Sequence, residues 1–148
     1  MFQVSVDETF AAGHALRGYR GKCENVHGHN YKVQVTLEGP SLDSIGLLYD
    51  FKDLKEAIQC SIRKLDHQFL NDVAPFDAVN PSAENMAKYF YEEISRLLET
   101  AAPQGNPGDP CTVKRVTVWE TETTTASYFA DGTRTRNQES GVRSQESE

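Results

Sequence analysis

The sequence has no apolar stretch that approaches the roughly 20 residues needed for a membrane-spanning helix. Its N-terminus, MFQVSVDETF, has no basic segment followed by an apolar one, so it lacks the pattern of a secretory signal. Cysteine is also scarce: Cys23, Cys60 and Cys111 are too few for a disulfide framework, and no Cys-x-x-Cys pair is present. We therefore expect no membrane partner, no structural zinc knot, and a location in the reducing cytoplasm.

Positive charge is the minority charge in this chain. There are 15 Lys and Arg against 22 Asp and Glu, which gives a net charge of −7. Nucleic-acid-binding proteins usually have a basic face, and none stands out here, so we expect no nucleic-acid partner. An anionic small substrate stays compatible with this charge, because a local pocket can differ from the whole surface. The length of 148 residues fits one domain with a substantial core.

Four segments have the pattern of β-strands. Residues 2–10 and 27–38 alternate apolar and polar side chains, which predicts half-buried strands. Residues 112–120 and 124–130 indicate a β-hairpin near the C-terminal end. The apolar face of the first two segments consists of Phe2, Val4, Val6, Tyr31, Val33, Val35 and Leu37.

Two further segments have apolar residues at spacings of three and four, which predicts amphipathic helices. We expect the first helix over residues 50–67, with Asp50 as its N-cap, and the second over residues 82–100. The apolar stripes are Phe51, Leu54, Ile58, Ile62 and Leu65 in the first helix and Met86, Phe90, Ile94 and Leu97 in the second.

The order β-β-α-α-β-β predicts an α+β fold in which a four-stranded antiparallel sheet packs against two helices. Only one face of such a sheet is covered by helices, so the other face must meet water or another subunit. We expect residues 1–130 to form this single domain. Residues 131–148 contain one large apolar residue, Val142, and are predicted to form a disordered tail because they cannot bury enough surface.

The segment GKCENVHGHNYKV, residues 21–33, contains two of the four histidines. His27 and His29 would share the face of Tyr31 if the strand extends back to them, because alternate residues of a strand point to the same face. On its own, a His-x-His pair is more often a surface feature. His14, close to the end of the first strand, supplies a third imidazole, and three histidines without a fourth ligand are typical of an open zinc site. We therefore predict a metal site, although spacing does not separate zinc from its rivals.

Cys23 lies in the same polar loop, next to Lys22 and near the predicted cation. Both positive charges would favour the thiolate form of its side chain. A thiolate beside an open metal site can act as a base or a nucleophile. The alternative is a small, inert, buried cysteine, which is what we expect for Cys60 and Cys111.

Two further groups leave a structural and a functional interpretation open. Asp66 and His67 end the first predicted helix. In the structural interpretation, His67 interacts favourably with the helix dipole and Asp66 is solvated, and the residues alone favour this interpretation. In the functional alternative, the carboxylate orients the imidazole and raises its basicity. Glu120 ends the strand RVTVWE, either in solvent or in a pocket where it would hold adjacent N–H donors of a ligand ring through paired hydrogen bonds.

The motifs FAAGH, GKCENVHGHNY, DFKDLK, LDHQFLN, PSAEN and VWET occur in the order and approximate spacing of the 6-pyruvoyl-tetrahydropterin synthase family. The chain resembles this family over about residues 2–130. ENVHGHNY and DFKDLK resemble its bacterial branch, the 6-carboxytetrahydropterin synthases of queuosine biosynthesis. The resemblance implies the tunnelling fold, in which the sheets of three subunits close a β-barrel and two trimers stack into a homohexamer.

The resemblance also implies roles for individual residues. One zinc ion per subunit would be bound by three histidines, a cysteine would be catalytic together with an Asp-His pair of a neighbouring subunit, and glutamates would bind the pterin. The matching positions are His14, His27 and His29 for zinc, Cys23, Asp66 and His67 for catalysis, and Glu120 and Glu84 for the pterin.

Sub-branches of the family with glutamate in place of the cysteine do other chemistry, so Cys23 argues for a synthase. The resemblance implies that 7,8-dihydroneopterin triphosphate is converted to 6-carboxytetrahydropterin, acetaldehyde and triphosphate. One alternative is a 6-pyruvoyl-tetrahydropterin synthase, which removes triphosphate and isomerises the side chain. Another is a pterin- or zinc-binding module without catalysis. A zinc hydrolase would need no cysteine, and no other feature of the sequence indicates such an enzyme.

Overall fold

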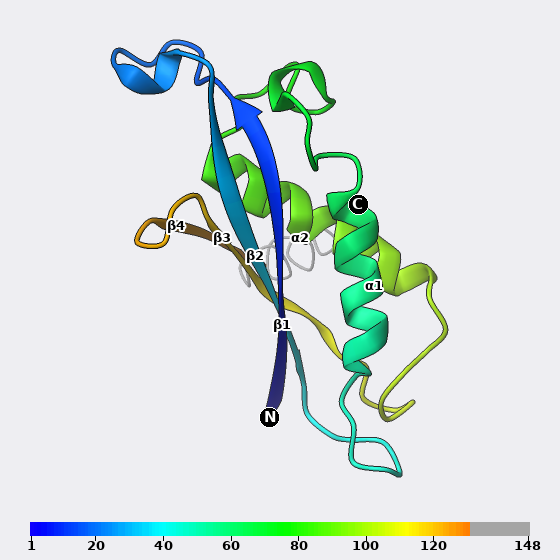
Figure 1. The fold of residues 1–148 in the computed structure, drawn as a ribbon. Helices are drawn as coiled ribbons and strands as arrows, with labels where there is room; N and C mark the ends of the chain where they lie inside the picture. The colour runs from blue at the N-terminus through cyan, green and yellow to red at the C-terminus, as the bar shows by residue number, and fades with distance from the viewer. Residues whose placement is uncertain (131–148) are drawn as a thin grey trace, which may run out of the picture.

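A computed structural model describes residues 1–130 of the chain. One layer is a four-stranded antiparallel sheet whose strands follow chain order, and the other layer consists of two helices (Figure 1). The elements are β1 (Phe2–His14), β2 (His27–Gly39), α1 (Phe51–Ile62), α2 (Ala83–Thr100), β3 (Thr112–Trp119) and β4 (Thr125–Phe129), with short 3₁₀ helices at Lys22–Glu24 and Leu70–Asp72. The predicted α+β fold is confirmed. The predicted tail, residues 131–148, lies outside the described residues.

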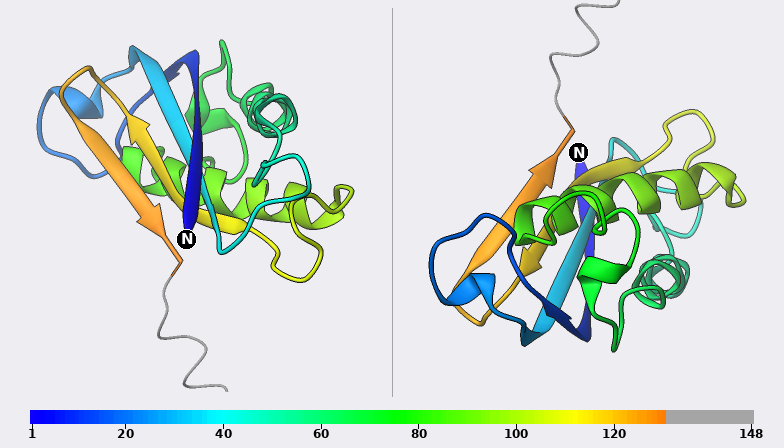
Figure 2. Two further views of the ribbon diagram at one scale, coloured as in Figure 1. Left: turned by 90° about the horizontal axis from the view of Figure 1, so that it is seen from below. Right: turned by 90° about the horizontal axis from the view of Figure 1, so that it is seen from above.

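Both helices lie on the same side of the sheet (Figure 2), and the core fills the space between the two layers. The alternation in β2 places one apolar face inward, as predicted, and the helices contribute their apolar stripes. Phe51 does not belong to the buried stripe, because it is 58% exposed at the start of α1. The fully buried members of the core include Tyr31, Val33, Val35, Leu37, Leu54, Ile58, Met86, Phe90 and Ile94.

Each helix begins at a residue whose side chain accepts a hydrogen bond from a free N–H group of the first turn. The Asp50 carboxylate accepts from the backbone N–H of Lys52 at 2.8 Å, which confirms the predicted N-cap of α1. The Ser82 hydroxyl accepts from the backbone N–H of Asn85 at 3.2 Å. These caps fix the point at which the chain enters each helix.

Two predicted boundaries are wrong, and tertiary hydrogen bonds explain both. β1 continues to His14 rather than ending near residue 10, because it pairs with β2 along its whole length. α1 ends at Ile62, so Asp66 and His67 do not lie at its C-terminus. The backbone N–H of His67 donates to the carbonyl of Ala11 at 2.6 Å, and φ of His67 is 57°, which no residue of an α-helix adopts.

The second face of the sheet carries no helix within residues 1–130. It is largely polar, although Phe129 also lies on it and is 51% exposed. Hydroxyl pairs link its strands: Ser5 with Thr36 at 2.7 Å, and Thr117 with Ser127 at 2.7 Å. This is the face that we expect to meet water or another subunit. In the described part of the chain, none of the helices combines the length and the apolar character needed to span a bilayer.

Candidate metal centre and adjoining cavity

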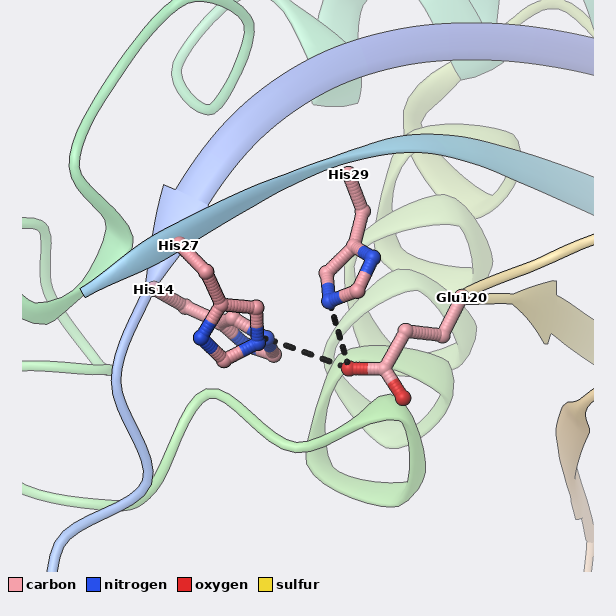
Figure 3. A group of neighbouring side chains, drawn as sticks. All are labelled: His14, His27, His29 and Glu120. Carbon is pink, nitrogen blue, oxygen red and sulfur yellow. Dashed lines mark hydrogen bonds and ion pairs between the residues drawn. The ribbon is translucent and has the colours of Figure 1, made fainter. Parts of the chain in front are cut away.

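The three histidines of the predicted site meet because of the register between β1 and β2. His14, the last residue of β1, pairs with His27, the first residue of β2. His29 lies two residues further along β2 and therefore points to the same face. Figure 3 shows the three imidazoles turned toward one another and toward the carboxylate of Glu120, which directly follows β3.

The potential ligand atoms are close together. Nε2 of His14 lies 2.9 Å from Nε2 of His27. Oε1 of Glu120 lies 3.1 Å from Nε2 of His14 and 3.3 Å from Nε2 of His29. One ligand atom from each of the four residues lies within 4.8 Å of the others. Tetrahedral zinc sites with metal–ligand distances near 2 Å have ligand atoms roughly 3.3 Å apart, so this spacing suits a metal ion.

The backbone partners of two imidazoles show which nitrogens carry lone pairs. Nδ1 of His14 lies 2.7 Å from the carbonyl of Pro81, and Nδ1 of His27 lies 2.7 Å from the carbonyl of Asn25. A carbonyl only accepts, so each Nδ1 carries the proton in the neutral ring and each Nε2 has a lone pair. Metal-binding histidines typically donate their second nitrogen in this way.

A cation therefore fits this cluster of side chains. The two lone pairs at 2.9 Å repel each other unless a cation lies between them, and the Glu120 carboxylate adds a further acceptor. Within residues 1–130, Nε2 of His29 is buried and makes no hydrogen bond, although Oε1 of Glu120 lies 3.3 Å away. The donor set of three imidazoles and one carboxylate fits zinc and similar transition metals.

Burial favours the uncharged, metal-binding form of two of the imidazoles. Desolvation lowers the pKa of His14, which is fully buried, while its hydrogen bond to Pro81 and the charge of Glu120 oppose the shift. Desolvation likewise lowers the pKa of His29, and the charge of Glu120 again opposes it. Neutral imidazoles at neutral pH are ready to bind a metal without first losing a proton.

The loop between α1 and α2 anchors the chain that follows His14. The Asn71 carboxamide accepts from the backbone N–H of Ala15 at 2.9 Å and donates to its carbonyl at 2.8 Å. Asn80 makes the same pair of bonds with the backbone of Arg17, both at 2.9 Å. Sequence reasoning missed these asparagines, since nothing in the sequence links them to partners more than 50 residues away.

A cavity of about 260 Å³ adjoins the cluster. Cys23, Glu84 and Glu120 all line it, so the structure brings together three of the predicted catalytic and pterin-binding residues. Glu120 belongs both to this cavity and to the histidine cluster. Cys23 lies in the first 3₁₀ helix, partly buried, and its carbonyl accepts from the backbone N–H of Leu16 at 2.8 Å.

Asp66 and His67 are not part of this cavity. His67 lines a different cavity of about 580 Å³, together with Val26, Gly28 and Phe69, and its side chain is 80% exposed. Nδ1 of His67 lies 2.9 Å from Oδ1 of Asp66, so the carboxylate orients the imidazole as in the functional interpretation. The backbone N–H of Ala11 donates to Asp66, and this hydrogen bond is the main cause of the lowered pKa of its carboxyl group.

Comparisons with known proteins agree with the motif pattern. Residues 3–131 match the family model described as 6-pyruvoyl tetrahydropterin synthase. The chain is 32% identical over 126 residues to the 6-carboxy-5,6,7,8-tetrahydropterin synthase of Aquifex aeolicus, covering 72% of this chain and 75% of that protein. It is 38% identical over 106 residues to the 6-pyruvoyl tetrahydrobiopterin synthase of Drosophila melanogaster. This match covers 62% of this chain and 63% of that protein. A solved structure of Caenorhabditis elegans 6-pyruvoyl tetrahydropterin synthase matches with a TM-score of 0.73 and 27% identity, over 88% of this chain and 96% of that one.

Proposed function

This chain belongs to the 6-pyruvoyl tetrahydropterin synthase family, and we propose that it is a zinc-dependent 6-carboxy-5,6,7,8-tetrahydropterin synthase of queuosine biosynthesis. The reaction converts 7,8-dihydroneopterin triphosphate to 6-carboxytetrahydropterin, acetaldehyde and triphosphate. The observation that carries the proposal is the cluster of imidazole nitrogens from His14, His27 and His29 beside a cavity lined by Cys23. The relative from Aquifex aeolicus with this name supports the choice of product.

In the proposed mechanism the histidines hold zinc, and the cavity beside them binds the pterin. A zinc ion supplies Lewis-acid polarisation of the hydroxyl oxygens on the substrate side chain. Sγ of Cys23, as thiolate, takes a proton from that side chain. Glu120 and Glu84 accept hydrogen bonds from the N–H donors of the pterin ring and hold the reacting carbons near Cys23.

A second proton passes through His67 of a neighbouring copy of the chain. Asp66 faces Nδ1 of this imidazole, which leaves Nε2 as the atom that exchanges the proton. Because His67 and Cys23 line different cavities of one chain, the complete site needs two copies. The polar face and the two edge strands, β1 and β4, support closure of a barrel by three copies of the chain. We propose that two such trimers form a hexamer. Each copy would contribute residues 1–130 as one domain.

One alternative within the family has specific support. The chain is 38% identical to a 6-pyruvoyl tetrahydrobiopterin synthase, so removal of triphosphate with isomerisation of the side chain is the second candidate reaction. The two reactions differ in their products, because only the first releases acetaldehyde.

Incubation of the zinc-loaded protein with 7,8-dihydroneopterin triphosphate, followed by mass spectrometry, tests the proposal. We expect acetaldehyde and 6-carboxytetrahydropterin in equal amounts. A pyruvoyl product without acetaldehyde would show that the chain catalyses the alternative reaction. A folded, zinc-loaded protein that binds the pterin without turnover would be a binding module.

Substitution of Cys23 tests its role as base. Cys23→Ala should keep zinc and lose about 10²–10⁴-fold in turnover, because it removes the group that takes the proton. The matched control is Cys60→Ala, since Cys60 is exposed on α1 and lines neither cavity. We expect that variant to match the wild type. Equal turnover of Cys23→Ala and Cys60→Ala would refute the assignment.

A further inference from the structure

Glu120 has two sets of partners that it cannot satisfy at the same time. Under the proposed function, both of its carboxylate oxygens accept hydrogen bonds from adjacent N–H donors of the pterin ring. In the structure, Oε1 instead lies 3.1 Å from Nε2 of His14 and 3.3 Å from Nε2 of His29. Figure 3 shows its second oxygen turned away from the imidazoles.

The position of Oε1 changes the kind of metal site that the residues form. Three imidazoles and one carboxylate give four protein ligand atoms, all within 4.8 Å of one another. Four protein ligands are typical of closed, structural sites, whereas catalytic sites use three and leave one position for the substrate. With Glu120 in this place, protein atoms fill all four coordination positions. Lewis-acid chemistry needs one of these positions free for the substrate.

We propose that Glu120 is the fourth metal ligand of the substrate-free protein and that binding of the pterin ring withdraws it from the metal. The ring then opens the coordination position that the substrate side chain uses. This inference rests on the proposed function for the identity of the ring. It adds to that function a control step, in which recognition of the ring is required before the metal becomes accessible.

The local structure allows Glu120 to change partners without a change of fold. Glu120 follows the last residue of β3, and its backbone N–H donates to the carbonyl of Thr124 at 3.1 Å, so the main chain stays fixed. Its side chain is 28% exposed and lines the cavity that also contains Cys23 and Glu84. Rotation of side-chain bonds is therefore enough to carry the carboxylate from the imidazoles into the cavity.

Electrostatics favours the resting arrangement in the absence of the ring. An imidazole binds a metal through a lone pair of the neutral ring, so His14, His27 and His29 do not offset the charge of a divalent cation. Glu120 is the negatively charged residue of the four and offsets part of that charge. The N–H donors of the ring give the carboxylate a replacement partner, which is why a ligand without the ring should leave the site closed.

Metal affinity tests the first half of the proposal without any turnover. Competition with a chelator should show that Glu120→Gln holds Zn²⁺ about ten-fold or more weakly than the wild type. Glu84→Gln is the matched control, because Glu84 lines the same cavity but is not in the metal-ligand cluster, and its affinity should stay within about two-fold. Unchanged affinity in Glu120→Gln would overturn the proposal.

The visible spectrum of the Co²⁺-loaded wild type tests the second half of the proposal, and the spectrum of Glu120→Gln is the reference. Unsubstituted pterin, which has the ring but no side chain, should change the Co²⁺ absorption bands of the wild type as it binds. Inorganic triphosphate should leave them unchanged. In Glu120→Gln, with folding checked by circular dichroism, the bands should differ before pterin is added. A wild-type spectrum that stays constant while calorimetry shows bound pterin would overturn the inference and leave the proposed function intact. Failure of pterin to bind would also overturn the inference, and the products of turnover would then decide the proposed function separately.

Discussion

Asp66 keeps its negative charge because two donors face its carboxylate. The backbone N–H of Ala11 lies 3.1 Å from Oδ1, and Nδ1 of His67 lies 2.9 Å from the same atom. The hydrogen bond from Ala11 is the larger cause of the lowered pKa of Asp66. Since the pKa in the folded protein is below that of the unfolded chain, folding is favoured by the ionised form.

The predicted consequence is a specific acid sensitivity. The stabilising contribution of Asp66 is complete above the ordinary aspartate pKa of about 4 and is lost as the pH falls through the lowered pKa of the folded protein. Urea unfolding of the metal-free protein at several pH values should therefore show a smaller loss of unfolding free energy in acid for Asp66→Asn than for the wild type. Identical pH profiles would contradict this assignment.

The main chemical groups of the site could be predicted from the sequence, whereas their partners could not. Alternation in a strand placed His27 and His29 on one face, and the structure brings His14 to the same place through the strand register. The family resemblance implied that Glu120 binds the pterin, and only the structure shows its carboxylate against two imidazoles. The carbonyl of Pro81, which fixes the tautomer of His14, comes from 67 residues away, and no local pattern indicates it.

At the scale of elements, the loop between α1 and α2 holds the end of β1 in place. Asn71 makes two hydrogen bonds to the backbone of Ala15, next to the buried His14. Asn71→Ala leaves two partly buried backbone groups without partners, so we expect a loss of about 1–3 kcal/mol in unfolding free energy. Because His14 then loses its fixed position, zinc affinity should fall about ten-fold.

Arg96→Ala is a suitable control for this measurement. Arg96 forms an exposed ion pair with Glu93 on α2 at 2.7 Å, and such pairs contribute about 1 kcal/mol or less. Its removal should leave zinc affinity unchanged. If Asn71→Ala binds zinc as tightly as Arg96→Ala does, the loop does not position the metal site.

Periodicity predicted the elements better than their ends. The apolar stripe of the first helix continues to Leu65, which is fully buried, yet α1 stops at Ile62. The apolar spacing therefore predicts which residues are buried, and it does not predict where the helix ends. Hydrogen bonds from the following turns to β1, such as His67 N–H to the carbonyl of Ala11, end the helix, and they depend on tertiary contacts that the local sequence does not reveal.

At the scale of the whole molecule, the proposed sharing of sites between copies predicts complementation. Cys23→Ala and His67→Ala should each be inactive alone. Mixed oligomers from their coexpression should recover about a quarter of wild-type turnover, because a quarter of the sites then combine an intact Cys23 with an intact His67. Coexpression of Cys23→Ala with His29→Ala should recover nothing, because one chain supplies both residues. Equal results for the two mixtures would place His67 and Cys23 in one chain's site.

The exposure of one face of the sheet could be predicted from the sequence, but the contacts on that face could not. Two helices cover only one face of a four-stranded sheet, so the exposure of the second face followed from the element order. The hydroxyl pairs across that face, and the separation of His67 from Cys23, depend on side-chain placement and became visible only in the structure.

The central claim is that His14, His27 and His29 form one metal site on which activity depends. Zn²⁺ titration of the chelator-treated protein, with turnover of 7,8-dihydroneopterin triphosphate measured at each step, tests it most directly. We predict that activity rises in proportion to bound metal and levels off at one ion per chain, and that His29→Ala neither binds the ion nor gains activity. Full activity of the metal-free protein, or equal metal uptake by His29→Ala, would contradict the account.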